Sequence, residues 1–168
     1  MSTAPVLAFV GVGANLDHPA AQVERGIEAL QALPQTELGA RSSLYASAPV
    51  DAPGPEYVNA VVALRTTLDA MPLLQALHDI EARFGRQRSE RNAPRTLDLD
   101  LLLYGNLHSD DAALRLPHPR LHQRAFVLLP LLEIAPALRV PGLGPLAGYM
   151  PQVQDQAIRR LEPRGAQQ

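Results

Sequence analysis

The chain has 168 residues and a formal net charge of −2, and it contains no cysteine and no tryptophan. All 15 of its basic residues are arginines, so the sequence also lacks lysine. These absences exclude a lysine-based phosphate loop, a Schiff-base lysine, a thiol nucleophile, a disulfide framework and a thiolate zinc site.

The first predicted element in chain order is a buried strand over residues 6–13, which form a short apolar run rich in β-forming residues. A turn follows at 15–19, and Pro19 suits the first turn of a helix whose apolar residues recur at helical spacing. Two further strands are predicted over 44–50 and 57–68, separated by a turn rich in proline and glycine. This part of the chain therefore predicts the succession β-α-β-β.

The next predicted element is a helix that starts near Pro72 and ends at Gly85, and a strand follows over 97–104. The resulting order, β-α-β-β-α-β, is typical of ferredoxin-like domains, so we expect an α+β fold with an antiparallel sheet. Residues 117–150 predict short helices added on the C-terminal side of this core, and residues 163–168 predict a disordered tail.

Length and patterning also bear on the class of protein. A chain of this length fits one domain, so residues 1–168 are expected to form a single domain. The sequence has no apolar run of about 18 residues, which predicts no membrane span. The N-terminal segment lacks the basic region of a signal peptide, so a cytoplasmic location is expected. The near-neutral net charge argues against a general nucleic-acid binder.

The last predicted strand carries two aspartates at alternate positions, Asp98 and Asp100. Because strand side chains alternate between faces, both carboxylates point to one face, and the leucines beside them point into a core. Neighbouring carboxylates repel each other, and a hard divalent cation such as Mg²⁺ relieves that repulsion. A solvated polar strand face is the alternative, although the strand is otherwise apolar. The pair is therefore a candidate magnesium site.

Positive charge is concentrated just before this strand, because residues 83–95 hold five arginines against one acidic residue. Arginine presents a planar fork that suits phosphate oxygens, and Arg86, Arg88, Arg91 and Arg95 all precede the aspartates. A cationic loop beside a metal-binding pair is what phosphoryl transfer requires. Plain solvation is the alternative for the loop taken alone. The concentrated charge suggests a small polyanion bound at one place.

Weaker signals lie elsewhere in the chain. Gly11 and Gly13 predict a tight strand-to-helix turn. A phosphate-binding loop is less favoured there, because the third glycine of a dinucleotide fingerprint and the lysine of a phosphate loop are both missing. Asn59 lies two residues beyond Tyr57 on the same strand face, and its amide can pair with the edge of a heterocycle. His118 stands between two prolines, where a structural or solvated histidine is the alternative to a ligand.

Short motifs along the chain carry a resemblance to a known family. In chain order they are Gly13-Ala-Asn15-Leu16, Ser42-Ser-Leu-Tyr45, Tyr57-Val-Asn59-Ala60, Ile80-Glu81, Gly85-Arg86-Gln-Arg88, Pro94-Arg-Thr-Leu-Asp-Leu-Asp100, Tyr104-Gly105, Pro117-His118 and Arg124-Ala-Phe126. With these motifs the sequence closely resembles the 6-hydroxymethyl-7,8-dihydropterin pyrophosphokinase family of folate synthesis. The resemblance covers about residues 6–150, and the run that ends at Asp100 is its most specific part.

The resemblance implies transfer of the β,γ-pyrophosphoryl group of ATP to the hydroxymethyl group of the pterin, with release of AMP. It implies two Mg²⁺ ions held by Asp98 and Asp100, which would act in catalysis together with Arg86, Arg88 and Arg95. The residues implied for ATP binding are Glu81, Arg86, Arg88, Arg95, His118 and Arg124. Those implied for the pterin are Ser47, Pro49, Val50, Tyr57, Asn59 and Phe126. The pterin would stack between the rings of Tyr57 and Phe126.

Two positions depart from the family pattern. Asn92 stands where the family often has tryptophan, so the aromatic ring that would pack over the closed site is missing. Ala48 stands where proline is common, in the segment that would contact the pterin through its backbone. The substrate hydroxyl would be the nucleophile, and a loose transition state demands positioning and charge stabilisation rather than a general base.

Two other functions stay open from the sequence alone. The first is a ferredoxin-like RNA-binding module that uses the arginine loop, although only Tyr57 offers a stacking ring on the strands. The second is a pterin-binding relative that has lost catalysis, against which the intact aspartate pair argues. The leading hypothesis predicts ATP and the pterin as small-molecule partners, no nucleic acid, no membrane, and a monomer.

Overall fold

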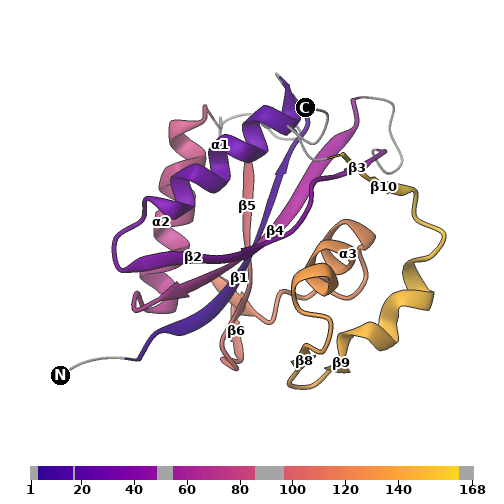
Figure 1. Cartoon of the computed structure of the whole chain (residues 1–168). Coiled ribbons are helices and arrows are strands. Elements are labelled where there is room, and N and C mark those ends of the chain that lie inside the picture. The colour runs from indigo at the N-terminus through magenta and orange to yellow at the C-terminus, as the bar shows by residue number, and fades with distance from the viewer. Residues whose placement is uncertain (1–3, 17, 49–54, 86–96, 163–168) are drawn as a thin grey trace.

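A central antiparallel sheet organises the chain, and helices lie against both of its faces (Figure 1). The computed structural model describes residues 4–16, 18–48, 55–85 and 97–162. The helices are α1 (Pro19–Gln31), α2 (Ala70–Arg83), α3 (Ala125–Ile134) and the 3-10 helix η1 (Leu146–Val153). The strands are β1 (Val6–Ala14), β2 (Thr36–Arg41), β3 (Tyr45–Ser47), β4 (Tyr57–Thr66), β5 (Asp98–Tyr104), β6 (Ser109–Asp111), β7 (Leu114–Leu116), β8 (Arg139–Val140), β9 (Gly144–Pro145) and β10 (Ile158–Arg160).

The strand order in the main sheet is β10-β3-β4-β1-β5, and β2 also pairs with β4. Every pairing in this sheet is antiparallel. β1 is central: it pairs with β4 along its whole length on one side and with β5 on the other. The hairpins β6–β7 and β8–β9 stand apart from the main sheet. The middle of the sheet is therefore formed by strands from the start, the centre and the later part of the chain.

Helices α1 and α2 cover one face of this sheet (Figure 1). The apolar stripe of α1 includes Ile27 and Leu30, and that of α2 includes Leu73, Leu77 and Ile80, all of them fully buried. They pack with the inward residues of β1, β4 and β5 in one hydrophobic cluster. Burying each such side chain contributes about 1.5–3 kcal/mol. This layer fixes α2 against β5.

Helix α3 covers the opposite face with the C-terminal segment (Figure 1). Its residues Leu128 and Leu131 are fully buried and form a second hydrophobic cluster with Phe9, Val61 and others. The sheet thus has apolar packing on both faces, which explains why β1 reads as a nearly continuous apolar run. Among the described ranges, no helix combines the length and the apolar character needed to cross a membrane.

Most predicted elements of the first hundred residues are confirmed. The strand predicted over 6–13 is β1, the helix predicted from Pro19 is α1, and the strand predicted over 97–104 is β5. The helix predicted near Pro72 is α2, and Gly85 follows its end with a φ of +88°, a conformation that favours glycine. The mixed helix and antiparallel sheet fold follows the prediction.

Two strand predictions in the first hundred residues need correction, and one strand in that part of the chain, β2, was not predicted. The strand predicted over 44–50 comprises only β3, and Pro49 and Val50 lie outside the described residues. The strand predicted over 57–68 ends at Thr66. β2 was missed because most of its residues are exposed, so it shows no apolar alternation. It joins the sheet through backbone pairing with β4, which the sequence pattern does not record.

The C-terminal part agrees with the prediction only in outline. The short helices predicted over 117–150 are α3 and η1, but the hairpin β8–β9 separates them. β10 was not predicted, because the apolar pattern fades after Pro151. The predicted disordered tail, residues 163–168, lies outside the described residues.

Candidate active site

Residues from three neighbouring strands line up on the α3 face of the sheet. Gly13 of β1 pairs with Asn59 of β4 on one side and with Asp98 of β5 on the other. Gly11 pairs with Asp100. Because residues directly opposite each other in an antiparallel pair share a face, the two aspartates and the asparagine project to the same side. The sheet register therefore brings together residues that are far apart in sequence.

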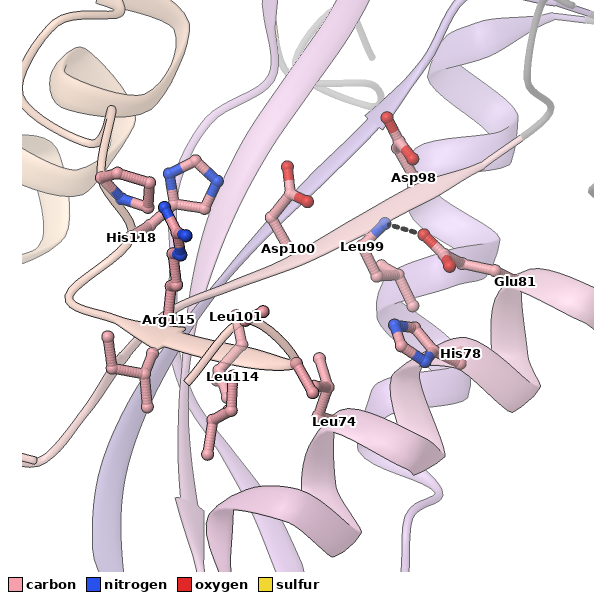
Figure 2. A pocket seen from close by; sticks show the side chains of 14 residues that line it. Leu74, His78, Glu81, Asp98, Leu99, Asp100, Leu101, Leu114, Arg115 and His118 are labelled. Atoms are coloured by element: carbon pink, nitrogen blue, oxygen red, sulfur yellow. Dashed lines mark hydrogen bonds between the residues drawn. The ribbon is translucent and has the colours of Figure 1, made fainter. Parts of the chain in front are cut away.

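The alternation predicted for β5 is confirmed. Leu99 and Leu101 are buried in the cluster below the α1 and α2 layer, whereas Asp98 and Asp100 are half-buried. Both aspartates line a surface pocket of about 360 Å³. Figure 2 shows the two carboxylates along one side of β5, with Leu99 pointing away between them. The strand therefore holds both carboxylates at the wall of one pocket.

Glu81 of α2 lines the same pocket and is only 2% exposed. Its Oε2 accepts the backbone N–H of Leu99 at 2.7 Å (Figure 2). A carboxylate that accepts a backbone N–H makes a charge-assisted hydrogen bond, stronger than a neutral one. Glu81 therefore holds the backbone of β5 at the residue between the two aspartates.

His118 lies on the opposite wall of the pocket, after the short strand β7. Its Nδ1 accepts the backbone N–H of Arg120 at 3.2 Å, which leaves the proton of the neutral ring on Nε2. Burial lowers the pKa of His118, and the positive charges of Arg124 and Arg120 lower it further. At neutral pH the ring is therefore uncharged and presents a single N–H donor.

Arg124 and Phe126 meet at the start of α3, where the guanidinium carbon lies 5.4 Å from the centre of the phenyl ring. Such a cation–π contact orients both side chains. α3 packs against β4, the strand that carries Tyr57 and Asn59. The structure therefore places these predicted residues over the same face of the sheet.

The remaining predicted residues lie on β3 and β4. Ser47 pairs with Tyr57, whose ring is 40% exposed, well above the exposure expected of a core tyrosine. Asn59 has a buried Oδ1 for which no hydrogen-bond partner is found among the described residues. A buried amide oxygen without a partner is costly, so Asn59 is suited to receive a donor from a bound molecule.

The predicted turn at Gly11 and Gly13 is wrong. β1 continues to Ala14, so both glycines lie within the strand, and neither has a positive φ. A Cβ built on Gly13 would come within 2.6 Å of the Asn59 Nδ2 atom. A side chain at residue 13 would therefore displace the Asn59 amide from the position that it occupies beside this glycine.

Several predicted site residues cannot be located, because Pro49, Val50, Arg86, Arg88 and Arg95 lie outside the described residues. Conversely, the pocket contains residues that the sequence did not single out, among them His78 and Arg115. His78 stands one helical turn before Glu81, so the helical spacing could have found it. Arg115 gave no such signal, because it lies on the three-residue strand β7.

Comparison with known proteins identifies relatives of the chain. Residues 9–136 match the family model described as 7,8-dihydro-6-hydroxymethylpterin-pyrophosphokinase (HPPK). The chain is 43% identical over 154 residues to the 2-amino-4-hydroxy-6-hydroxymethyldihydropteridine pyrophosphokinase of Pseudomonas aeruginosa, covering 91% of this chain and 95% of that one. It is 38% identical over 159 residues to the Haemophilus influenzae protein of the same name, covering 94% and 99%.

A solved structure shares the fold. The crystal structure of wild-type Plasmodium falciparum HPPK-DHPS matches with a TM-score of 0.68 at 13% identity. The match covers 93% of this chain and 44% of that longer chain, so the present chain spans less than half of it. At so low an identity the likeness concerns the fold alone. With a family model that matches most of the sequence and relatives matched along nearly their whole length, the chain belongs to the 7,8-dihydro-6-hydroxymethylpterin-pyrophosphokinase (HPPK) family.

Proposed function

We propose that the chain transfers the β,γ-pyrophosphoryl group of ATP to the hydroxymethyl oxygen of 6-hydroxymethyl-7,8-dihydropterin and releases AMP, a step of folate biosynthesis. Family membership over most of the chain supports this activity. The structural observation that supports this activity most is the cross-strand alignment of Asn59, Gly13 and Asp98. It places a candidate pterin-binding residue, Asn59, two strands away from a candidate metal ligand, Asp98.

Asp98 and Asp100 are suited to bind Mg²⁺. The described residues contain no group of three or more histidines, cysteines or acidic residues able to hold a metal by themselves. Two carboxylates that need further oxygen ligands fit the usual mode of Mg²⁺, which binds one or two carboxylates together with substrate phosphates and water. Two such ions would neutralise charge on the triphosphate and ease deprotonation of the pterin hydroxyl.

The ATP side of the proposed site lies around the pocket. His118 offers an uncharged N–H donor to phosphate or base atoms, and Arg124 adds positive charge nearby. Arg115 is a further cation on the pocket wall. We propose that Arg86, Arg88 and Arg95 bind the phosphates, as the family resemblance implies. Glu81 acts here by fixing the strand that carries the aspartates.

The pterin side of the proposed site lies over β3, β4 and the start of α3. The exposed ring of Tyr57 and the ring of Phe126 are available for stacking. The buried Oδ1 of Asn59 is placed to accept an N–H of the pterin ring. Ser47 belongs to the segment that would contact the pterin, together with Pro49 and Val50.

In the proposed mechanism the pterin hydroxyl attacks the β-phosphorus in line with the departing AMP. The bond from the hydroxymethyl oxygen to the β-phosphorus forms as the bond from the β-phosphorus to the bridging oxygen of AMP breaks, and the hydroxyl proton passes to water. The chain contributes positioning and positive charge, which a loose transition state requires, rather than a general base. Holding both substrates in one site converts an encounter of two molecules into an intramolecular step.

The topology supports a ferredoxin-like core, which we also propose. The order β5-β1-β4-β3, with α1 after β1 and α2 after β4 on one face, fits a split β-α-β arrangement in which β2 and β3 together take the place of one strand. We further propose that residues 1–168 form one pyrophosphokinase domain.

The assay for this function follows the nucleotide product. The purified chain with ATP, Mg²⁺ and the pterin is expected to form AMP and the pterin diphosphate in equal amounts, as chromatography would detect. AMP formation should require both substrates. Release of ADP, or AMP formation that does not depend on the pterin, would contradict the proposal.

Gly13→Ala is expected to raise the KM for the pterin by about tenfold or more, because its methyl group displaces the Asn59 amide. Gly11→Ala is the matched control on the same strand. The atoms nearest to its methyl group would belong to the Leu102 side chain, the closest at 3.6 Å, which is ordinary contact. Steady-state kinetics with varied pterin would separate the two variants, and an equal KM for both would remove the assigned role of Asn59.

A further inference from the structure

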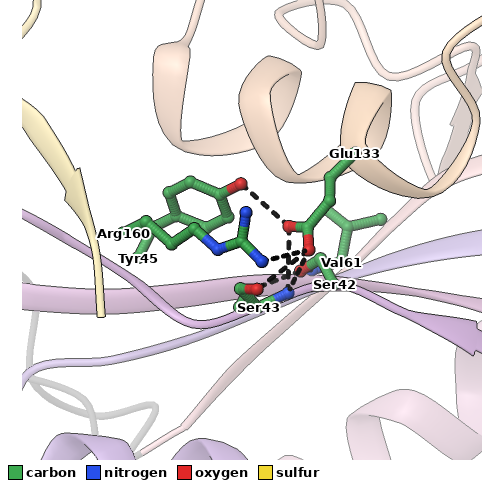
Figure 3. Close-up of polar contacts among 6 residues, drawn as sticks. All are labelled: Ser42, Ser43, Tyr45, Val61, Glu133 and Arg160. Carbon is green, nitrogen blue, oxygen red and sulfur yellow. Dashed lines mark hydrogen bonds and ion pairs between the residues drawn. The ribbon is translucent and has the colours of Figure 1, made fainter. Parts of the chain in front are cut away.

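Glu133, near the end of α3, binds residues of two other segments. Its two carboxylate oxygens accept the backbone N–H of Ser43 at 3.0 and 3.1 Å. They also accept the hydroxyl groups of Ser43 and Tyr45, both at 2.8 Å. The Arg160 guanidinium of β10 lies 3.5 Å away. Figure 3 shows the four residues converging beneath α3, and we call them the Glu133 cluster.

The groups of the Glu133 cluster stabilise one another in fixed protonation states. Burial disfavours the carboxylate, but hydrogen bonds from Tyr45 and Ser43 and the charge of Arg160 still hold the pKa of Glu133 below its usual range. Burial and the neighbouring carboxylate raise the pKa of Tyr45 to about 12. Around neutral pH the carboxylate is therefore ionised and the tyrosine hydroxyl keeps its proton, so the hydrogen bonds are charge-assisted.

The strand bound by the Glu133 cluster is buried but short. β3 has three residues and lies between β4 and another three-residue strand, β10. It carries Ser47 opposite Tyr57, and the segment proposed to contact the pterin continues directly from its end. A short strand near a sheet edge gains few hydrogen bonds from pairing alone, so a contact from outside the sheet matters more for its position.

Helix α3 is well fixed without β3. Leu128 and Leu131 are fully buried against the sheet. At the start of the helix, the Gln156 side chain accepts the Ala125 N–H at 2.8 Å and donates to the Gln123 carbonyl at 2.9 Å. α3 is therefore fixed independently of the contact, and Glu133 adds a contact from α3 to the strand that β4 and β10 already pair with.

We propose that Glu133 is a positioning residue for pterin binding, which holds β3 against α3 and so sets the place of Ser47. This inference rests on the proposed function. The described residues assigned to metal and to the ATP pocket lie on α2, β5 and the segment before α3, and in the sheet β4 and β1 separate β5 from β3. Loss of the contact should therefore affect the pterin far more than ATP.

The test measures both Michaelis constants in Glu133→Ala, Glu133→Gln and Tyr45→Phe. Glu133→Ala is expected to raise the KM for the pterin about tenfold and to leave the KM for ATP within about twofold. Glu133→Gln keeps one acceptor oxygen, and Tyr45→Phe removes one of the donors, so each should give a smaller shift. Glu28→Ala is the control, because it removes an exposed carboxylate of α1 outside the Glu133 cluster and should change neither KM.

Thermal unfolding identifies which variants are folded. If Glu133→Ala does not fold, the comparison rests on the KM values of Glu133→Gln and Tyr45→Phe. An unchanged pterin KM in the folded variants, or a parallel rise of both constants, would overturn the inference. Pterin affinity is also measured directly, by fluorescence titration without ATP. If the wild-type chain forms no AMP, the proposed function fails, and this titration shows separately whether Glu133 affects pterin binding.

Discussion

Asp98→Asn and Asp100→Asn are each expected to lower kcat by about a thousandfold or more, because each removes one of the two charged ligands proposed for Mg²⁺. Asparagine keeps the shape of the side chain and one oxygen, so the variants test the charge rather than the packing. The measurement is the rate of AMP formation at saturating ATP and pterin. Because the pterin-side residues are untouched, pterin affinity in the absence of ATP should stay near the wild-type value.

Asp79→Asn is the matched control for both substitutions. Asp79 is an exposed residue of α2 that accepts a hydrogen bond from Gln75, so its loss should leave kcat unchanged. Thermal unfolding of all three variants should show folded protein. A near-normal kcat in either Asp98→Asn or Asp100→Asn would contradict the proposed metal site.

The sequence predicted the parts of the fold that depend on burial. β1, α1, α2 and β5 each bury a continuous run or a helical stripe of apolar residues, and this pattern is readable without a structure. The same alternation predicted that Asp98 and Asp100 share a face, because the leucines beside them, Leu97, Leu99 and Leu101, had to be buried. The metal-site prediction thus followed from the packing of one strand.

The parts that the sequence did not predict depend on backbone pairing or on distant contacts. β2 and β10 are largely exposed, so nothing in their composition distinguishes them from loops. Gly11 and Gly13 suggested a turn, whereas a side chain at residue 13 would displace the Asn59 amide on the neighbouring strand. Ser43 and Glu133 meet across 90 residues of sequence. Such pairs follow from the sheet register, which local patterns do not determine.

The candidate site also contains residues whose prediction the structure locates and residues whose roles stay predictions. Glu81, Asp98, Asp100 and His118, predicted from separate motifs, line one pocket. The arginines proposed to bind phosphate lie outside the described residues, so their roles stay predictions. The resemblance assigned Glu81 to the ATP side, and the structure shows its carboxylate accepting the backbone N–H of Leu99 in β5.

That contact makes Glu81 a third residue whose replacement should have a large effect. Glu81→Ala is expected to lower the free energy of unfolding by about 2 kcal/mol, because the buried N–H of Leu99 loses its acceptor and a cavity is left behind. The backbone between the two aspartates would then be free to shift, and a small displacement of catalytic groups can cost about a hundredfold in rate. Urea unfolding and kcat, measured on the same preparation, report the two effects.

Glu81→Gln separates the hydrogen bond from the charge. Glutamine keeps an oxygen that can accept the Leu99 N–H, so this variant should recover most of the unfolding free energy and most of the rate lost in Glu81→Ala. Glu28→Ala is the control on an exposed helical face, and its stability should stay within about 0.5 kcal/mol of the wild-type value. A stable but inactive Glu81→Gln variant would show that the Glu81 charge acts on the substrates directly. Recovery of both properties would assign Glu81 to the support of β5.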